Sequence, residues 1–186
     1  MKKILLTVGL MLVFGIVSNV NSTYASASEI DSKNVENEQI IDFQNVENGQ
    51  IIESTVLENG GTREIIKISD DPYANVMMPM DAGRWDLIGD SLFKSRSQTV
   101  YSHGGDFKLI IHQYKYSGTT YMYKLVEEDP LSEFSVDDFT GPKSVGIFEV
   151  VYRGINGWVD GDDGTAELHL SKLTYPFDDV YVQFWD

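Results

Sequence analysis

Short segments of alternating apolar and polar residues most strongly constrain the fold of this chain. The alternation is clear in Phe107, Leu109 and Ile111, whose side chains would share one face of a strand. Seven such segments follow one another, turn-forming residues separate them, and no long helical period intervenes. We therefore expect an all-β domain over residues 81–186, an antiparallel β-sandwich or small barrel of about seven strands. The expected strands are residues 84–93, 97–102, 106–116, 120–127, 145–153, 165–172 and 179–185.

The first 27 residues have the pattern of an export signal. Lys2 and Lys3 precede the apolar run Ile4–Val17, and Ala25-Ser26-Ala27 fits a signal peptidase. The run is short for a bilayer span, and no stop-transfer segment follows it. We expect residues 1–27 to be a cleaved signal peptide. The mature chain would then be secreted, without a membrane span, by a Gram-positive bacterium.

Composition narrows the classes of partner. The formal net charge of −15 repels nucleic acid and anionic lipid, so neither is expected as a partner. The chain has no cysteine, which excludes disulfides, zinc–thiolate sites and thiol nucleophiles. Its stability must come from the core alone, to which 10 tyrosines, 9 phenylalanines and 3 tryptophans can contribute large buried faces.

Residues 28–80 form an acidic segment with a short internal repeat. The nine residues Asn34–Asp42 recur, with two changes, as Asn45–Glu53. So short a unit cannot build a solenoid core, so we expect a disordered tail, a pro-segment or an edge hairpin. A hairpin signal follows the repeat. It consists of residues 51–58, the turn Asn59-Gly60-Gly61 and residues 62–69.

The tetrapeptide Gly89-Asp90-Ser91-Leu92 resembles the signature block of GDSL-type esterases and lipases. The resemblance implies that Ser91 is a nucleophile, served by a histidine from an Asp-x-x-His motif, on a layered α/β fold. None of the three histidines has an aspartate three residues before it. The sequence therefore favours a non-catalytic protein, with the esterase as a lesser alternative.

An acidic turn offers a candidate calcium site. Asp160, Asp162 and Asp163 lie together, and calcium accepts six to eight oxygen ligands in loose geometry. The EF-hand template fails, however, because Thr165 stands where it requires glycine. The alternative is that Asp-Gly is ordinary turn chemistry. No other cofactor is expected.

Four tyrosines form a candidate binding face. If residues 106–116 pair with 120–127 across the turn Ser117-Gly118-Thr119, period-two alternation places these rings on one side, together with a histidine. Such a row of rings can stack against sugars, or it can fill one end of a sandwich core. The residues concerned are Tyr114, Tyr116, Tyr121, Tyr123 and His112.

A wider pattern joins Gly83-Arg84-Trp85, Tyr101-Ser102-His103-Gly104 and the final Val182–Trp185. This layout is similar to that of lactococcin-type β-sandwich bacteriocins, and the resemblance implies an exported competition protein. The chain is longer and more acidic than that family. Taken together, the sequence predicts a non-catalytic binding module for a cell-envelope glycan or an extracellular protein, with the bacteriocin-like role as the alternative.

Overall fold

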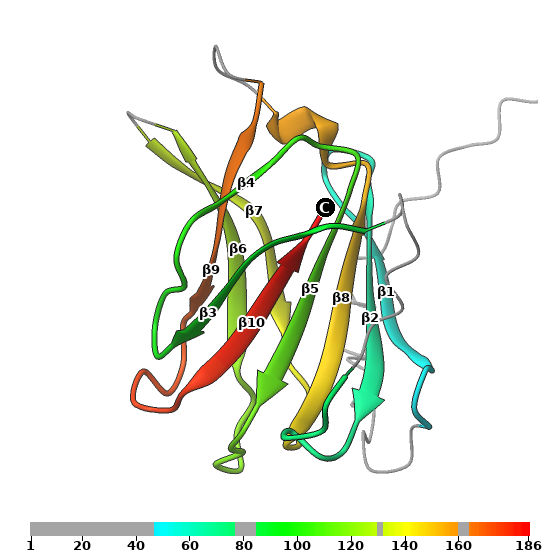
Figure 1. Ribbon diagram of the computed structural model, residues 1–186, viewed down its shortest axis with the longest axis vertical. Coiled ribbons are helices and arrows are strands. Elements are labelled where there is room, and N and C mark those ends of the chain that lie inside the picture. The colour runs from blue at the N-terminus through cyan, green and yellow to red at the C-terminus, as the bar shows by residue number, and fades with distance from the viewer. Residues whose placement is uncertain (1–46, 77–84, 130–131, 160–163) are drawn as a thin grey trace, which may run out of the picture. The chain divides into compact units, whose positions relative to one another are not determined.

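A computed structural model describes residues 47–76, 85–129, 132–159 and 164–186. Its ten strands form two antiparallel sheets packed face to face, so the expected all-β sandwich is confirmed (Figure 1). The six-stranded sheet runs in the order β1 (Ile51–Val56), β2 (Thr62–Ser69), β8 (Gly146–Arg153), β5 (Asp106–Gln113), β10 (Val180–Trp185) and β3 (Leu87–Phe93). The four-stranded sheet runs in the order β4 (Val100–Ser102), β9 (Ala166–Lys172), β6 (Met122–Asp129) and β7 (Ser132–Thr140). A short 3₁₀ helix, η2 (Ile155–Trp158), follows β8.

The core lies between the sheets and follows the predicted alternation. Phe107, Leu109 and Ile111 on β5 are all fully buried in it. Core residues of β10, beside β5 in the same sheet, and of β9, on the opposite sheet, follow the same period of two, because successive strand residues point to opposite faces. They are Ala166, Leu168, Leu170, Val180, Val182 and Phe184.

The hairpin at the start of the described chain is confirmed. β1 and β2 pair across Asn59-Gly60-Gly61, where Gly60 has φ +84° and the Gly61 N–H donates to the Asn59 side chain at 2.9 Å. β1 is an edge strand of the six-stranded sheet, and β2 lies between β1 and β8. Strands on both sides of residue 81 therefore share one sheet. The expected signal peptide lies outside the described residues.

One expectation about pairing is wrong, and one strand was not expected. Residues 106–116 and 120–127 do not form a hairpin, because β5 pairs with β8 and β10 whereas β6 pairs with β7 and β9. The turn near Gly118 instead carries the chain from one sheet to the other. Asp137 and Asp138 lie between two of the expected strands, and the structure places them within β7, an edge strand whose pairing with β6 contains a bulge.

The outer face of the six-stranded sheet carries a second apolar cluster. Ile110, Ile147 and Trp185 are buried there beneath Ala74 and other residues of the chain around β2 and β3. All β5 side chains after Asp106 are therefore buried, on both faces of the sheet. This covering segment also brings Pro72 and Tyr73 to the same face.

Candidate functional site

The four predicted tyrosines do not share one face. Tyr121 and Tyr123 are fully buried between the sheets, as the core alternative predicts. The Tyr121 hydroxyl donates to Asp178 Oδ2 at 2.6 Å, and the Tyr123 hydroxyl donates to Gln113 Oε1 at 3.2 Å. Burial raises the pKa of both phenols. These two rings are core residues and are inaccessible to a ligand.

Tyr114 and Tyr116 lie beyond the end of β5 and are partly exposed. Tyr114 joins three other rings in what we call the outer aromatic cluster: Tyr73, His112, Tyr114 and Tyr181. Ring centroids are 5.1 Å apart for Tyr73–Tyr114, 6.3 Å for His112–Tyr114 and 5.2 Å for His112–Tyr181. Two of the five predicted ligand-binding residues therefore belong to one cluster.

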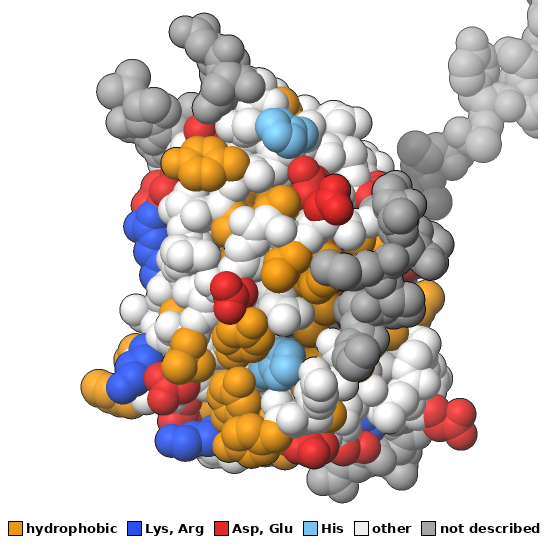
Figure 2. All heavy atoms as spheres, viewed as in Figure 1, with side chains coloured by type: hydrophobic (Ala, Val, Ile, Leu, Met, Phe, Trp, Pro, Cys, Tyr) orange, Lys and Arg blue, Asp and Glu red, His pale blue; other side chains and the backbone are white. Residues whose placement is uncertain are grey.

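Strand register explains how the cluster forms. Tyr181 on β10 pairs with His112 on β5 and, on its other side, with Leu92 on β3. Tyr73 is 77% exposed and Leu92 is 65% exposed, so the cluster opens to solvent. On the corresponding face of the molecule, hydrophobic side chains gather around a histidine over β10 and β5 (Figure 2).

Polar groups line the cluster and have defined roles. His112 Nδ1 lies 2.9 Å from the Pro72 carbonyl oxygen, which can only accept. Nδ1 therefore carries a proton, and in the tautomer with that single proton Nε2 is an acceptor. The Tyr181 hydroxyl donates to Asp90 Oδ2 at 2.8 Å and accepts from Gln183 Nε2 at 3.3 Å. Burial, reinforced by Asp90, raises the pKa of Tyr181, so the hydroxyl stays protonated at neutral pH.

The cluster thus combines aromatic faces with hydroxyl, amide, carboxylate and imidazole groups. Aromatic faces attract the C–H faces of sugars, and the polar groups match sugar hydroxyls. Sequence reasoning missed Tyr73, Tyr181, Asp90 and Gln183. The alternation in β10 predicted the side to which Tyr181 points, but only the cross-strand register reveals its neighbours.

Of the remaining sequence candidates, the structure describes Ser91 but not the acidic turn. Ser91 lies on β3 in register with Val182, and its Oγ accepts from the Gln98 N–H at 3.2 Å. His112 points to the opposite face of the same sheet, and the layered α/β fold implied by the esterase resemblance is not formed. Asp160, Asp162 and Asp163 lie outside the described residues, so the calcium site stays a prediction.

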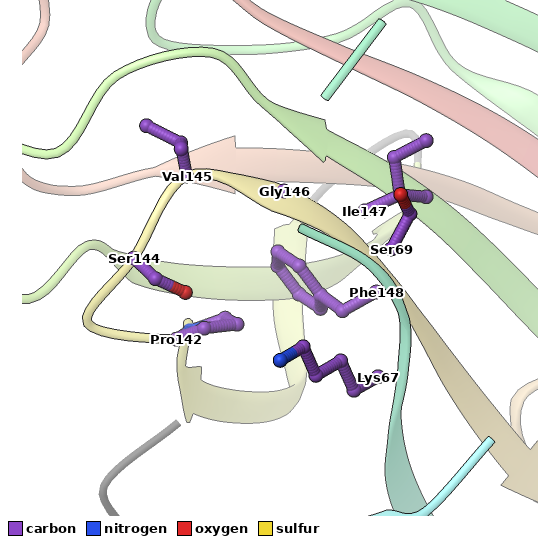
Figure 3. Close-up of a pocket in the computed structure, with 8 residues that line it drawn as sticks. All are labelled: Lys67, Ser69, Pro142, Ser144, Val145, Gly146, Ile147 and Phe148. Carbon is purple, nitrogen blue, oxygen red and sulfur yellow. The ribbon is translucent and has the colours of Figure 1, made fainter. Parts of the chain in front are cut away.

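A small cavity and a larger groove also occur in the described part of the structure. A cavity of about 10 Å³ lies between Lys67 and the turn before β8, with Phe148 at its base, and has room for about one water molecule (Figure 3). A groove of about 590 Å³ lies between the edge strands β1 and β7. Asp137 on its wall already bonds to Arg63 and Tyr152, so that wall is part of the structural scaffold.

Fold and site together define the class: an antiparallel β-sandwich with an aromatic cluster on one outer face. A family model described as "YndA coiled coil domain" matches residues 87–184, just over half of the chain. The chain belongs to the YndA family. It is 32% identical over 109 residues to Uncharacterized protein YndA of Bacillus subtilis (strain 168), which covers 56% of this chain and 76% of that protein.

The words "coiled coil" in the family description do not fit the structure, because the described residues within 87–184 form strands and one 3₁₀ helix. No solved structure matches this chain. Across the residues that the structure describes, no helix has the length and apolarity needed to span a membrane.

Proposed function

We propose that this chain is an exported, non-catalytic protein that binds a glycan of the cell envelope through the outer aromatic cluster. The observation that carries the proposal is the group of four contacting rings, with Tyr73 exposed within it and Leu92 exposed beside it. Exposed apolar groups in a contiguous patch mark interaction sites more often than single exposed residues do. The signal-like N-terminal sequence supports export.

The charges favour a neutral sugar polymer. Asp90 lies within the site, and the whole chain has a formal charge of −15, so anionic wall polymers would be repelled. The neutral sugar strands of peptidoglycan, in sacculi stripped of their anionic polymers, are therefore the expected ligand. The carboxylate of Asp90 and Nε2 of His112 would accept hydrogen bonds from sugar hydroxyls, and the tyrosine rings would stack against the pyranose faces.

The test is co-sedimentation of the protein with purified wall sacculi, with and without their anionic polymers. We expect binding to both, tighter to the stripped sacculi, and at least about tenfold weaker binding for Tyr73→Ala and Tyr114→Ala. Both side chains lie outside the core, so these variants should melt close to the wild-type temperature. Tyr101→Ala is the matched control, because Tyr101 is 58% exposed on β4 of the other sheet.

Two outcomes would reject the proposal. One is a wild-type protein that stays in the supernatant with every wall preparation. The other is equal binding by the wild type, Tyr73→Ala and Tyr114→Ala, which would place the contact elsewhere. In that second case, loss of binding in Tyr101→Ala would place the contact on the four-stranded sheet.

A further inference from the structure

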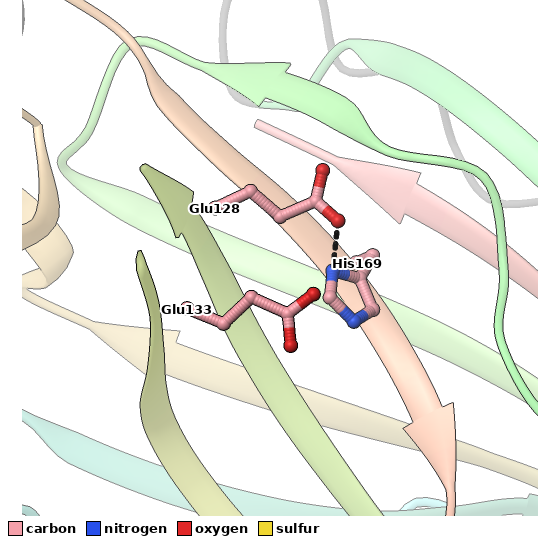
Figure 4. A group of neighbouring side chains, drawn as sticks. All are labelled: Glu128, Glu133 and His169. Carbon is pink, nitrogen blue, oxygen red and sulfur yellow. Dashed lines mark ion pairs between the residues drawn. The ribbon is translucent and has the colours of Figure 1, made fainter. Parts of the chain in front are cut away.

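A second polar cluster lies on the four-stranded sheet, on the face directed away from the core. Glu128 on β6, Glu133 on β7 and His169 on β9 offer ligand atoms that all lie within 4.8 Å of one another (Figure 4). Glu128 and Glu133 are direct cross-strand partners. Like charges placed opposite one another in a sheet are destabilising, so a cation bound between the two carboxylates would stabilise this position.

His169 adds a buried ring nitrogen without a hydrogen bond to the two carboxylates. Its side chain is 2% exposed, and its Nε2 lies 3.1 Å from Ser171 Oγ. Its Nδ1 is buried and makes no hydrogen bond within the described part of the chain, although Glu128 Oε1 lies 3.1 Å away. Where Nε2 carries the proton, two lone pairs face each other across this gap. A buried polar atom left without a partner is costly.

The separation fits two ligands of one metal ion. Zinc binds histidine nitrogen and carboxylate oxygen at about 2.0–2.2 Å, so neighbouring ligands at angles of about 90–110° lie roughly 3.0–3.5 Å apart. Nδ1 and Oε1 meet this condition. Glu133 has a side chain that is 60% exposed and can close the remaining distance.

Arg96 is the cation beside the cluster. It forms ion pairs with Glu128 and, at 3.3 Å, with Glu133. Its side chain is 47% exposed, so it can move into solvent and leave the carboxylates to another cation. An exposed ion pair of this kind contributes little stability.

We propose that Glu128, Glu133 and His169 form a binding site for a divalent transition metal of the zinc class, and that Arg96 competes with the metal for the two carboxylates. The mixed nitrogen and oxygen ligands favour zinc over calcium, which prefers oxygen alone. The site lies on the other sheet from the outer aromatic cluster and does not depend on the proposed glycan binding.

The experiment is a calorimetric titration of the full, untagged chain with Zn²⁺, repeated with Ca²⁺. We expect one zinc per chain, and at least about tenfold weaker binding for His169→Gln and for Glu133→Gln. Arg96→Gln should bind zinc several-fold more tightly, since the competing cation is gone. His103→Gln is the control, because His103 is an exposed loop residue.

No zinc binding by either the wild type or Arg96→Gln at millimolar concentration would overturn the proposal and leave the cluster as an ion-pair network. Zinc binding that His169→Gln and Glu133→Gln leave unchanged would also overturn it. Should His169→Gln fail to fold, Glu133→Gln decides alone, because its exposed side chain can be neutralised without disturbing the core.

Discussion

Two clusters in this sandwich each combine one arginine with two carboxylates, yet they differ in what surrounds the arginine. Arg63 on β2 has a side chain that is 5% exposed, and it pairs with Glu53 and, at 2.6 Å, with Asp137 on the opposite sheet. Arg96 is 47% exposed and pairs with Glu128 and Glu133 on one outer face. The Arg63 cluster thus joins the two sheets. In the Arg96 cluster, by contrast, the exposed arginine can be replaced by another cation.

Hydrogen bonding separates the two clusters further. Both terminal nitrogens of Arg63 donate, to Asp137 and Asp138 on one side and to Glu53 and Thr55 on the other, although Nε has no partner among the described groups. In the Arg96 cluster the buried atoms without a hydrogen bond are Nδ1 of His169 and Oε1 of Glu128, which are both potential ligands. A buried pair with its charges matched indicates structure, whereas a buried lone pair without a donor indicates a site.

The largest expected difference between the clusters concerns stability. Arg63→Met leaves Asp137 buried without its cation, so we expect a loss of about 3–5 kcal/mol in the free energy of unfolding at pH 7. Burial already raises the pKa of Asp137 against the opposing effect of Arg63. Adding Asp137→Leu should recover part of the loss. Urea unfolding measures both, and an equal loss in Arg96→Met would erase the distinction.

A second difference lies in the response to acid, measured in chelator so that no metal intervenes. The pKa of His169 is about 4 in the folded chain, below its ordinary value of 6.5. The unfolded chain therefore binds a proton first as pH falls. Stability from the neutral ring is complete above about pH 6.5 and is lost towards pH 4, by about 3 kcal/mol.

His169→Gln should remove this component of the acid response, so that its stability falls less steeply than that of the wild type between pH 7 and pH 4. Thermal melts across this range test the difference. Parallel curves for the two proteins would mean that His169 is protonated alike in the folded and unfolded chains.

A smaller effect tests the single hydrogen bond that completes the Arg63 cluster. The Tyr152 hydroxyl donates to Asp137 Oδ2 at 3.1 Å, and Tyr152 is fully buried. Tyr152→Phe should cost about 1–2 kcal/mol, because it leaves a charged acceptor short of one donor. Urea unfolding of Tyr152→Phe beside Ser171→Ala, which removes the partner of His169 Nε2, provides the comparison. A larger loss of unfolding free energy in Ser171→Ala than in Tyr152→Phe would mean that the Arg96 cluster, and not the Arg63 cluster, is the structural one.

The smallest effect is expected at Arg96 itself. Arg96→Gln should change the free energy of unfolding by less than about 1 kcal/mol, because exposed ion pairs are weak. Raising the salt concentration should reduce even this difference, since salt screens exposed charges. A loss of several kcal/mol that persists in high salt would show that Arg96 is structural like Arg63.

The sequence predicted the strands better than it predicted their partners. Alternation in Phe107, Leu109 and Ile111 identified both a strand and its buried face, because one-sided burial imposes a period of two. β7 was not predicted, because its Ser and Asp residues are typical of a turn. The local sequence does not show that Asp137 pairs with the buried Arg63. Pairing depends on residues far apart in the chain, which local patterns do not encode.

The same limit applies to the sites. Tyr114 and His112 were named from a hairpin that does not form, and they meet because β10 lies beside β5. Glu128, Glu133 and His169 come from three strands. Because residues 133 and 169 are far apart along the chain, the sequence does not show that their side chains lie close together. In each case the residue types indicated a chemistry, and the order of strands in the sheets decided which of them meet.

The burial of β5 on both faces has a consequence for motion within the sandwich. This strand is hydrogen-bonded to β8 on one side and to β10 on the other, with apolar side chains above and below it. Its amide protons can reach solvent only when the whole domain opens, whereas those of the edge strands β1, β3, β4 and β7 are freed by local fraying. Hydrogen exchange should therefore slow from the edge strands of the sheets towards β5, whose backbone amides should exchange last.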